Sequence, residues 1–420
     1  MTIDPENLLR ALAGAAINAA DPNVRVPAVL PTAPKRAIVI GAGKASAAMA
    51  KAVETAWPDT DLSGVVVTRY GYEVPCDRIE IVGADHPVPD AAGLNAASRI
   101  LEYASAATKG DLVIALISGG GSALLTAPAD GITFEEKQSV NRALLRSGAD
   151  IGEMNMLRKH LSKIKGGRLA AAAYPAQLLT IMISDVPGDD PAVIASGPTV
   201  PDPSTFADAR AVVEKYKLEI PDSVAKHLSA GEHETPKPGD KVFTAGELVF
   251  AAKPDKSIAA AADVARKAGL TVIDLGDLIE GEARDVGREH ADMALACKAG
   301  NGAGQAPCVI LSGGETTVTM RGNGFGGRNT EYLLGVAKRL AGAEGIYAVA
   351  CDTDGVDGSE DNAGAFINST TCARAKASGL SVAAALDGND AYSLFENIGD
   401  LYVTGPTFTN VNDFRAILVV

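Results

Sequence analysis

Residues 38–46 read IVIGAGKAS, in which a short β-branched strand enters a Gly-Ala-Gly turn and Lys44 follows at the start of an expected helix. Glycine lets backbone N–H groups approach an anion closely, and a helix N-terminus adds a partial positive charge. Lys44 can add a full charge. The segment therefore predicts a phosphate site built from Gly41, Gly43 and Lys44. The alternative is a plain strand-to-helix turn with an exposed lysine.

Two common nucleotide motifs fit this loop poorly. A dinucleotide fingerprint needs a third glycine, where this chain has Ser46, and an acid after the second strand, where the run 64–68 ends in Arg69. Ser46 could still allow close packing, and Arg69 could face an NADP phosphate. A Walker loop needs a first glycine where Ile38 stands, and Ser or Thr in place of Ala45. Neither motif is therefore indicated.

The composition is that of an α/β protein with two or three domains, since 47% of its 420 residues are hydrophobic and 44 are glycine. A formal charge of -14 argues against a nucleic acid or an anionic membrane as partner. Its five cysteines are scattered, which favours reduced thiols, and no long uncharged apolar run occurs. We expect a cytoplasmic protein that acts on small molecules, alone or as a homodimer.

Short apolar strands alternate with Ala-rich helical patterns along the chain, which predicts a Rossmann-like, doubly wound and mostly parallel sheet. The polar segment 231–240 is the expected linker. We therefore predict two α/β domains, residues 1–235 with the GAGK and SGGGS loops and residues 236–420 with the SGGE, GGRN and DTDG loops. The strands are expected near 37–40, 64–68, 79–82, 112–117, 178–183, 241–244, 270–274, 307–311, 346–351 and 400–403, and helices include 44–56, 90–106, 134–148 and 160–173.

Ligands of open α/β sheets bind at the carboxyl ends of strands, so the loops that follow the strands matter most. Several of these loops are rich in glycine, and such loops can form anion-binding nests of N–H groups. Sharp turns without a ligand are the alternative. The residues expected to bind the cofactor here are Ser118, Gly119, Gly120, Gly121, Ser122, Gly313, Gly314 and Glu315, and the GGRN loop adds the cation Arg328.

Aspartates at strand ends suit a Mg²⁺–nucleotide complex, because Mg²⁺ keeps several waters and uses one or two protein carboxylates. We expect Asp185, Asp190 and Asp352 to bind the metal and Asp189 to activate a hydroxyl. An EF-hand starting at Asp352 is excluded by Val356 and Ala363 at required ligand positions. Helix capping is the alternative role for these aspartates.

A basic cluster lies in MNMLRKHLSKIKGGRLA, within an otherwise acidic protein. If residues 157–169 form one helix, Arg158 and Lys165 share a face and could bind a small carboxylate substrate together with His160. A solvated helix face is the alternative. Asn329, beside Arg328, is a further candidate for substrate binding.

The chain resembles the glycerate 2-kinase family, whose members are often labelled hydroxypyruvate reductases in tartrate-degradation gene clusters. The resemblance covers nearly the whole chain, in the family's order. It implies two α/β domains with the active site in the cleft between them, and phosphorylation of D-glycerate on its 2-hydroxyl by ATP with a divalent metal. It also implies that Lys44 and Arg328 are catalytic. The motifs that carry it are GAGKAS (41–46), DHPVPD (85–90), SGGGSALL (118–125), LRKHLSKIKGGRLA (157–170), SDVPGDDPAVIASGPT (184–199), LSGGETT (311–317), GFGGRNTEYLL (324–334) and DTDGVDGSEDNAGA (352–365).

Two other functions stay open at this point. An NAD(P)H-dependent hydroxypyruvate reductase would explain the Gly-Ala-Gly start, but the acid expected after the second strand is absent. A metabolite-binding regulatory protein would explain two α/β lobes, but gives no reason for cations in two separate glycine loops.

Overall fold

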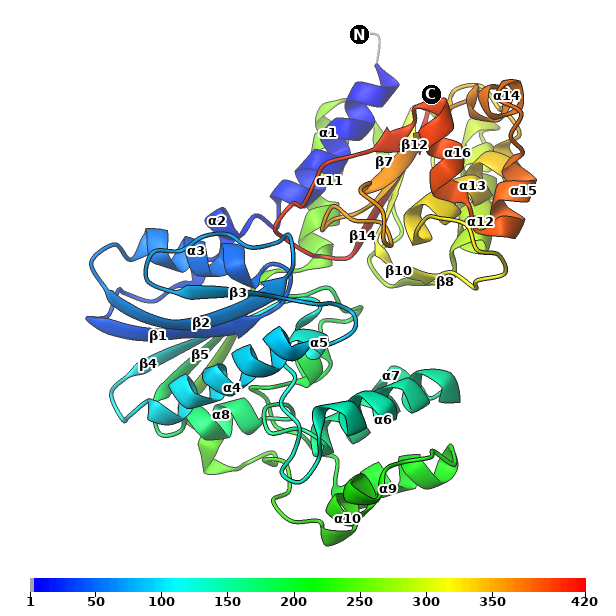
Figure 1. The fold of residues 1–420 in the computed structure, drawn as a ribbon. Helices are drawn as coiled ribbons and strands as arrows, with labels where there is room; N and C mark the ends of the chain where they lie inside the picture. Colours follow the sequence, from blue (N-terminus) through cyan, green and yellow to red (C-terminus); the bar gives the residue numbers. More distant parts are fainter. Residues whose placement is uncertain (1–3) are drawn as a thin grey trace. The chain divides into compact units, whose positions relative to one another are not determined.

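The computed structural model describes residues 4–420, which divide into two compact units (Figure 1). The N-terminal unit contains residues 22–184 and 189–251. The C-terminal unit contains residues 4–21, 185–188 and 252–420. Each unit is built around its own six-stranded sheet.

The sheet of the N-terminal unit has the strand order β3-β2-β1-β4-β5-β6, the order of a doubly wound Rossmann-like sheet. Strands β1 to β5 pair in parallel. Strand β4 is buried along its whole length, which explains its continuous apolar sequence. The predicted fold of this unit is confirmed. Its strands are β1 (Arg36–Ala42), β2 (Asp61–Arg69), β3 (Glu80–Ala84), β4 (Leu112–Ile117), β5 (Gln177–Ile183) and β6 (Gly246–Ala252).

Helices α3 (Ser46–Ala56) and α4 (Ala91–Ala106) cover opposite faces of this sheet (Figure 1). A separate layer of helices packs around its own apolar core, to which Leu144, Leu157 and Phe206 contribute. This layer consists of α6 (Phe134–Ser147), α7 (Ile151–His160), α9 (Phe206–Lys215) and α10 (Asp222–Ala230). The remaining short helices are α2 (Pro22–Arg25), α5 (Gly121–Leu124), α8 (Arg168–Ala173) and the 3₁₀ turns η1 (Pro27–Val29), η2 (Ile194–Ser196) and η3 (Lys241–Phe243).

The sheet of the C-terminal unit is mixed and has the order β13-β12-β11-β14-β9-β7. Only β7 and β9 pair in parallel among its described pairings, and β14 runs antiparallel to both of its neighbours. A separate two-stranded sheet joins β8 and β10. The strands are β7 (Thr271–Asp274), β8 (Ile279–Glu282), β9 (Cys308–Ser312), β10 (Gly314–Thr317), β11 (Ile346–Asp352), β12 (Gly364–Ile367), β13 (Leu401–Tyr402) and β14 (Asp413–Val419).

Alternate side chains of the mixed sheet enter two different cores, as the period of a strand requires. Ala416 and Leu418 pack with residues of α1 and α11, whereas Ile417 and Val419 pack with residues of α12 and α13. The sheet is therefore covered by helices on both faces. The helices of this unit are α1 (Pro5–Asn18), α11 (Pro254–Lys267), α12 (Ala283–Lys298), α13 (Arg328–Leu340), α14 (Thr371–Ala377), α15 (Val382–Gly388) and α16 (Ala391–Ile398).

The course of the chain between the units differs from the sequence expectation of a boundary at 235/236. Segment 231–240 lies inside the N-terminal unit, because the chain continues to β6 at the edge of the first sheet. The strand expected near 241–244 is instead the turn η3, and β6 begins at Gly246. Helix α1 belongs to the C-terminal unit, since its apolar face packs beside α11.

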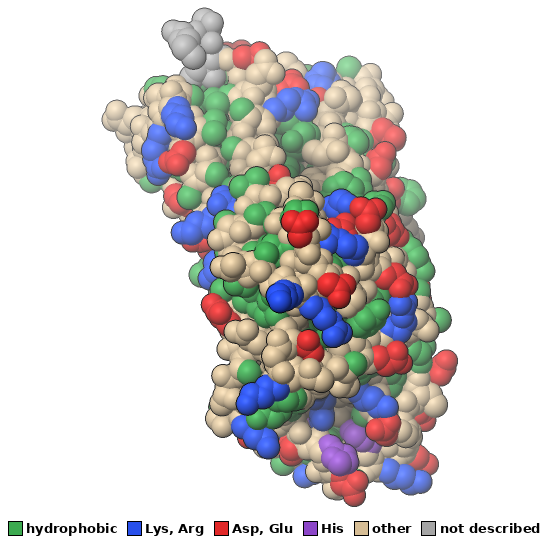
Figure 2. Space-filling view, turned by 90° about the vertical axis from the view of Figure 1, so that its left-hand side faces the viewer, with side chains coloured by type: hydrophobic (Ala, Val, Ile, Leu, Met, Phe, Trp, Pro, Cys, Tyr) green, Lys and Arg blue, Asp and Glu red, His purple; other side chains and the backbone are tan. Residues whose placement is uncertain are grey.

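The surface carries charges of both signs. On the face shown in Figure 2, Lys and Arg side chains are interspersed with Asp and Glu. No helix among residues 4–420 is long and apolar enough to cross a membrane.

Candidate active site

The GAGK and SGGGS loops meet at the carboxyl ends of β1 and β4. The backbone N–H of Lys44 donates to Gly119 O at 2.8 Å, and that of Ala45 donates to Ser118 Oγ at 3.0 Å. Gly43 has a φ of 140°, and a Cβ atom there would lie 2.1 Å from Ser118 Oγ. Only glycine allows this close approach. The order of the sheet reverses between β1 and β4, and this switch point is where such sheets bind ligands.

A cavity of about 370 Å³ opens beside the SGGGS loop, within the N-terminal unit. We call it the basic cavity, because its lining includes four basic side chains and no Asp or Glu. The basic residues are Lys137, Arg142, Arg158 and Lys165. These basic side chains come from α6, from α7 and from the loop before α8. The structure thus brings Arg158 and Lys165 together, as the sequence predicts, and adds Lys137.

Arg158 and Lys165 reach one cavity although they do not share a helix. Helix α7 ends at His160, and Gly166 and Gly167 have φ values of 58° and 80° before α8 starts. The single helix expected over 157–169 is therefore wrong, because α7 ends at His160, Ser162 pairs with Pro128, and the chain turns through the two glycines before α8. Lys165 is placed by hydrogen bonds from its Nζ to Ser122 O at 2.5 Å and to Ser122 Oγ at 3.0 Å.

Burial and mutual repulsion disfavour the protonated forms of the basic side chains in this cavity. Burial and the charge of Arg158 lower the pKa of Lys137 to about 7. Burial, with the charges of Lys137 and Arg158, lowers the pKa of Lys165 well below its usual range. Burial also lowers the pKa of Arg158. A bound anion would relieve this repulsion, so the cavity is suited to an anionic ligand.

His86 and Lys44 lie at the glycine end of the basic cavity. A Cβ atom at Gly120 would lie 3.1 Å from the His86 ring and 3.5 Å from Lys44 Cγ. Because His86 lines the cavity, the catalytic lysine implied by the family resemblance stands next to the basic cavity.

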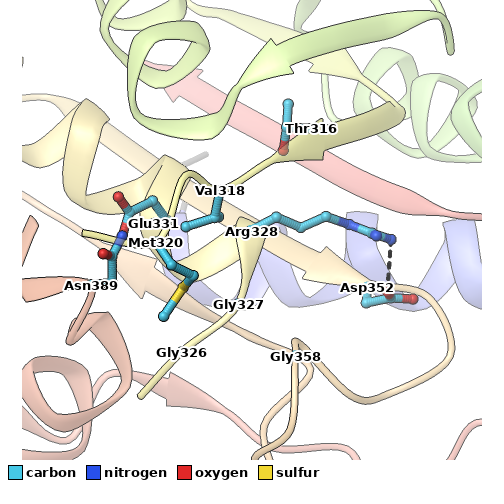
Figure 3. Close-up of a pocket in the computed structure, with 10 residues that line it drawn as sticks. All are labelled: Thr316, Val318, Met320, Gly326, Gly327, Arg328, Glu331, Asp352, Gly358 and Asn389. Atoms are coloured by element: carbon cyan, nitrogen blue, oxygen red, sulfur yellow. Dashed lines mark hydrogen bonds and ion pairs between the residues drawn. The ribbon is translucent and has the colours of Figure 1, made fainter. Parts of the chain in front are cut away.

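Arg328 is the first residue of α13, in the C-terminal unit, and it hydrogen-bonds four side-chain acceptors, of which Figure 3 shows Asp352. Its guanidinium donates to Asp413 Oδ1 at 2.8 Å, to Asp352 Oδ2 at 2.9 Å, and to Glu315 Oε1 and Asn412 Oδ1 at 3.0 Å. Burial disfavours its charged form, but the charges of Asp413, Asp352 and Glu315 raise its pKa well above the usual range. The guanidinium is therefore charged and fixed in direction.

A smaller pocket of about 250 Å³ lies beside Arg328. Asp352 and Glu331 line it along with the backbone of Gly326, Gly327 and Gly358 (Figure 3). Its electrostatic character is opposite to that of the basic cavity, because its lining contains two carboxylates and one cation.

Asn329, predicted to bind substrate, has a structural role in the described chain. Its Nδ2 donates to Asp413 Oδ1 at 2.8 Å, and its backbone N–H donates to Asp357 Oδ1 at 2.9 Å. Asp357 also accepts from the N–H and hydroxyl of Thr330 through its other oxygen. Asp357 thus caps the start of α13 and thereby helps to hold Arg328, the residue before Asn329, in the pocket wall.

The aspartates predicted to bind metal have other partners in the structure. Asp352 pairs with Arg328, Asp190 Oδ1 accepts from the Ala192 N–H at 2.8 Å, and Asp185 Oδ2 accepts from Asn410 Nδ2 at 3.0 Å. Among the described residues no group of three or more His, Cys, Asp or Glu could hold a metal ion. The residues present therefore do not form a ready metal site.

Neither His160 nor a residue of the SGGE loop is among the residues that line the basic cavity. His160 is buried, its Nδ1 hydrogen-bonds Met156 O at 2.8 Å, and its ring packs edge-on against Phe206. It is not among the residues that line the cavity. Gly314 and Glu315 belong to β10, where a Cβ on Gly314 would lie 2.3 Å from Ile279 O. The glycine at this position is required by the pairing with β8.

Several residues of these sites were not predicted from the sequence. Lys137 stands in a helix that looks amphipathic and solvated, and Asp413 and Arg415 stand in a strand that the sequence analysis did not identify. The apolar run AILVV directly follows NDFR in the sequence, and this short apolar run is the signal that could have revealed β14.

Comparison with known proteins places the chain among kinases. A domain of unknown function, DUF4147, matches residues 8–229, and the MOFRL family matches residues 308–413. The D-glycerate 2-kinase of Thermotoga maritima is 40% identical, over 94% of either chain. A crystal structure of glycerate kinase from that organism has a TM-score of 0.89 and 38% identity, and covers 99% of both chains.

A protein of Agrobacterium vitis that carries the provisional name of hydroxypyruvate reductase is 53% identical, over 99% of this chain and 95% of its own. Fold and relatives together define the class as the glycerate kinases, which are phosphotransferases. The chain belongs to the glycerate 2-kinase family. The resemblance found in the sequence is thereby confirmed.

Proposed function

We propose that this protein transfers the γ-phosphoryl group of ATP to the 2-hydroxyl of D-glycerate, giving 2-phospho-D-glycerate and ADP. The observation that carries the proposal is the pairing of two glycine loops at the switch point with a basic cavity that has no carboxylate in its lining. Relatives named glycerate 2-kinase, which match nearly the whole chain, support the same reaction.

Catalysis of phosphoryl transfer depends mostly on positioning and on neutralising charge. The substrate oxygen forms a bond to the γ-phosphorus while the bond to the β-phosphate oxygen breaks, and the hydroxyl proton leaves to a base. Lys44 and Arg328 are the proposed cations that stabilise the migrating group. Asp189, which holds a left-handed φ of 54°, is the proposed base.

The glycine loops would bind phosphates through backbone N–H groups. The cations Arg158 and Lys165 would bind an anionic group of a reactant, whereas Asn329 and His160 would act only through the residues that they support. A divalent cation such as Mg²⁺ would enter with ATP and supply charge neutralisation. Asp185, Asp190 and Asp352 remain its proposed ligands, and each would have to leave a present partner.

The test is a direct comparison of two reactions on one preparation. We expect Mg²⁺-dependent consumption of ATP with D-glycerate, formation of 2-phosphoglycerate by ³¹P NMR, and loss of turnover when EDTA removes the metal. The competing activity is NADH or NADPH oxidation with hydroxypyruvate, which the name of the Agrobacterium relative suggests. Reductase activity without ATP turnover would overturn the proposal.

A cytoplasmic location and a homodimer are parts of the same proposal.

A further inference from the structure

The basic cavity has features that D-glycerate does not need. A three-carbon acid would fill a small part of about 370 Å³, a volume in the range of pockets for larger organic ligands. D-Glycerate carries one negative charge, whereas four basic side chains line this one cavity, namely Lys137, Arg142, Arg158 and Lys165. This count of cations fits a polyphosphate better than a single carboxylate.

Apolar side chains also line the cavity. They include Val88 from the His-Pro loop and Leu144 and Leu145 from α6, with Phe134 and Val140 on the same helix. Such walls suit a flat heterocyclic base and do not suit a small polar acid, because burying the hydroxyls of the acid there would leave them without hydrogen bonds.

Two amides on one face of α6 could read the edge of a base. Gln138 donates from its Nε2 to Pro89 O at 2.9 Å, and Asn141 accepts the Arg158 Nε–H through its Oδ1 at 2.9 Å. Each hydrogen bond occupies only one of the two polar groups of its amide, the NH₂ of Gln138 and the carbonyl oxygen of Asn141. The acceptor Oε1 of Gln138 and the donor Nδ2 of Asn141 therefore remain for a ligand, and adenine presents a donor and an acceptor side by side on its N6–N1 edge.

The pocket beside Arg328 is a poor alternative for a polyphosphate. Asp352 and Glu331 line it, and its cation Arg328 is already paired with three carboxylates. Like charges would oppose the phosphates there.

We propose that the basic cavity is the nucleotide site, with the phosphates on Lys137, Arg158 and Lys165 and the adenosine against the apolar walls of α6. The GAGK loop at its glycine end then receives the terminal phosphate next to Lys44. This inference rests on the proposed function, since ATP is the phosphoryl donor only in that reaction.

Photolabelling with 8-azido-ATP tests the site without relying on turnover. The azide becomes reactive next to the base, so we expect labelled peptides from residues 134–145 or 86–89, and protection from labelling by excess ATP. Labels confined to residues 316–331 would overturn the inference while leaving the kinase reaction untouched. Absence of ATP turnover and of ATP-protected labelling together would instead reject the proposed function.

Steady-state kinetics of Lys137→Met give a second test, with Arg146→Met as control. Arg146 lies on the same helix, is exposed and does not line the cavity. We expect Lys137→Met to raise the KM for ATP about tenfold or more and to leave the KM for D-glycerate within about twofold. Arg146→Met should change neither. A raised KM for D-glycerate with an unchanged KM for ATP would show that the cavity binds the acid and would overturn the inference.

Discussion

Asp413 accepts the Nε–H of Arg328 through Oδ1 at 2.8 Å, and its other oxygen accepts from Arg415 at 2.5 Å. Asp413 and Arg415 are two residues apart on β14, so their side chains lie on one face of the strand. Arg415 is buried and is held in turn by Gly313 O at 3.0 Å and by the ring of Tyr332. Asp413 is therefore a positioning residue for Arg328, fixed by a second arginine behind it.

Substitution of Asp413 by Asn should lower both stability and turnover. The change leaves two arginines near one neutral amide, and breaking such buried pairs costs about 3–5 kcal/mol. If Asp413 also aims Arg328, kcat should fall by more than the folded fraction accounts for, with the KM for ATP unchanged. Thermal melts and kinetics measure both quantities. Asp263→Asn, at an exposed position on α11, is the control, and a lower melting temperature with normal kcat would limit Asp413 to a structural role.

Replacing Lys44 by Ala should lower kcat by roughly two to four orders of magnitude, the size of loss seen when a donor to a transition-state oxyanion is removed. The fold should be retained, since the loop is held by backbone contacts to Gly119 and Ser118. Lys44→Arg should recover little, because the guanidinium restores charge without the same geometry. Circular dichroism and steady-state kinetics check this. A raised KM for ATP at unchanged kcat would show that Lys44 only binds nucleotide.

Arg328→Ala should resemble Lys44→Ala in its loss of kcat. If both cations stabilise one migrating phosphoryl group, the double variant should lose much less than the sum of the two single losses in free energy. Measurement of kcat for the four proteins of this cycle gives the coupling. Full additivity would mean that the two residues act in separate steps.

Nucleotide affinity should fall as the pH rises through about 7. Burial and the charge of Arg158 lower the pKa of Lys137 to about 7 in the free protein, and its protonated form is the one that attracts an anion. Bound phosphate raises this pKa, so binding takes up a proton above pH 7 and weakens there. Titration calorimetry with ADP at pH 6, 7 and 8 checks the trend. Lys137→Met should flatten this pH dependence, and an equally steep fall in the variant would contradict the assignment.

The sequence alone determines the elements that depend on local pattern. The continuous apolar run of β4 and the glycines after β1 can be interpreted without knowing any distant partner. Burial on both faces of the sheet requires apolar residues in β4, and a φ of 140° requires glycine at residue 43. Lys44 and Arg328 could be proposed as site residues from local pattern as well. They stand beside glycines in loops that end strands or start helices.

The tertiary structure decides which distant side chains meet. Lys137 joins Arg158 and Lys165 only because α6 packs beside α7, and its spacing along α6 carries no sign of that neighbour. Asp413 reaches Arg328 across 85 positions of sequence, through the pairing of β14 with β9 and β11. Helix α1 likewise joins the C-terminal unit through an apolar face that would fit many partners. Hydrophobic periodicity fixes which face of an element is buried, whereas the partner of that face is chosen by packing over the whole chain.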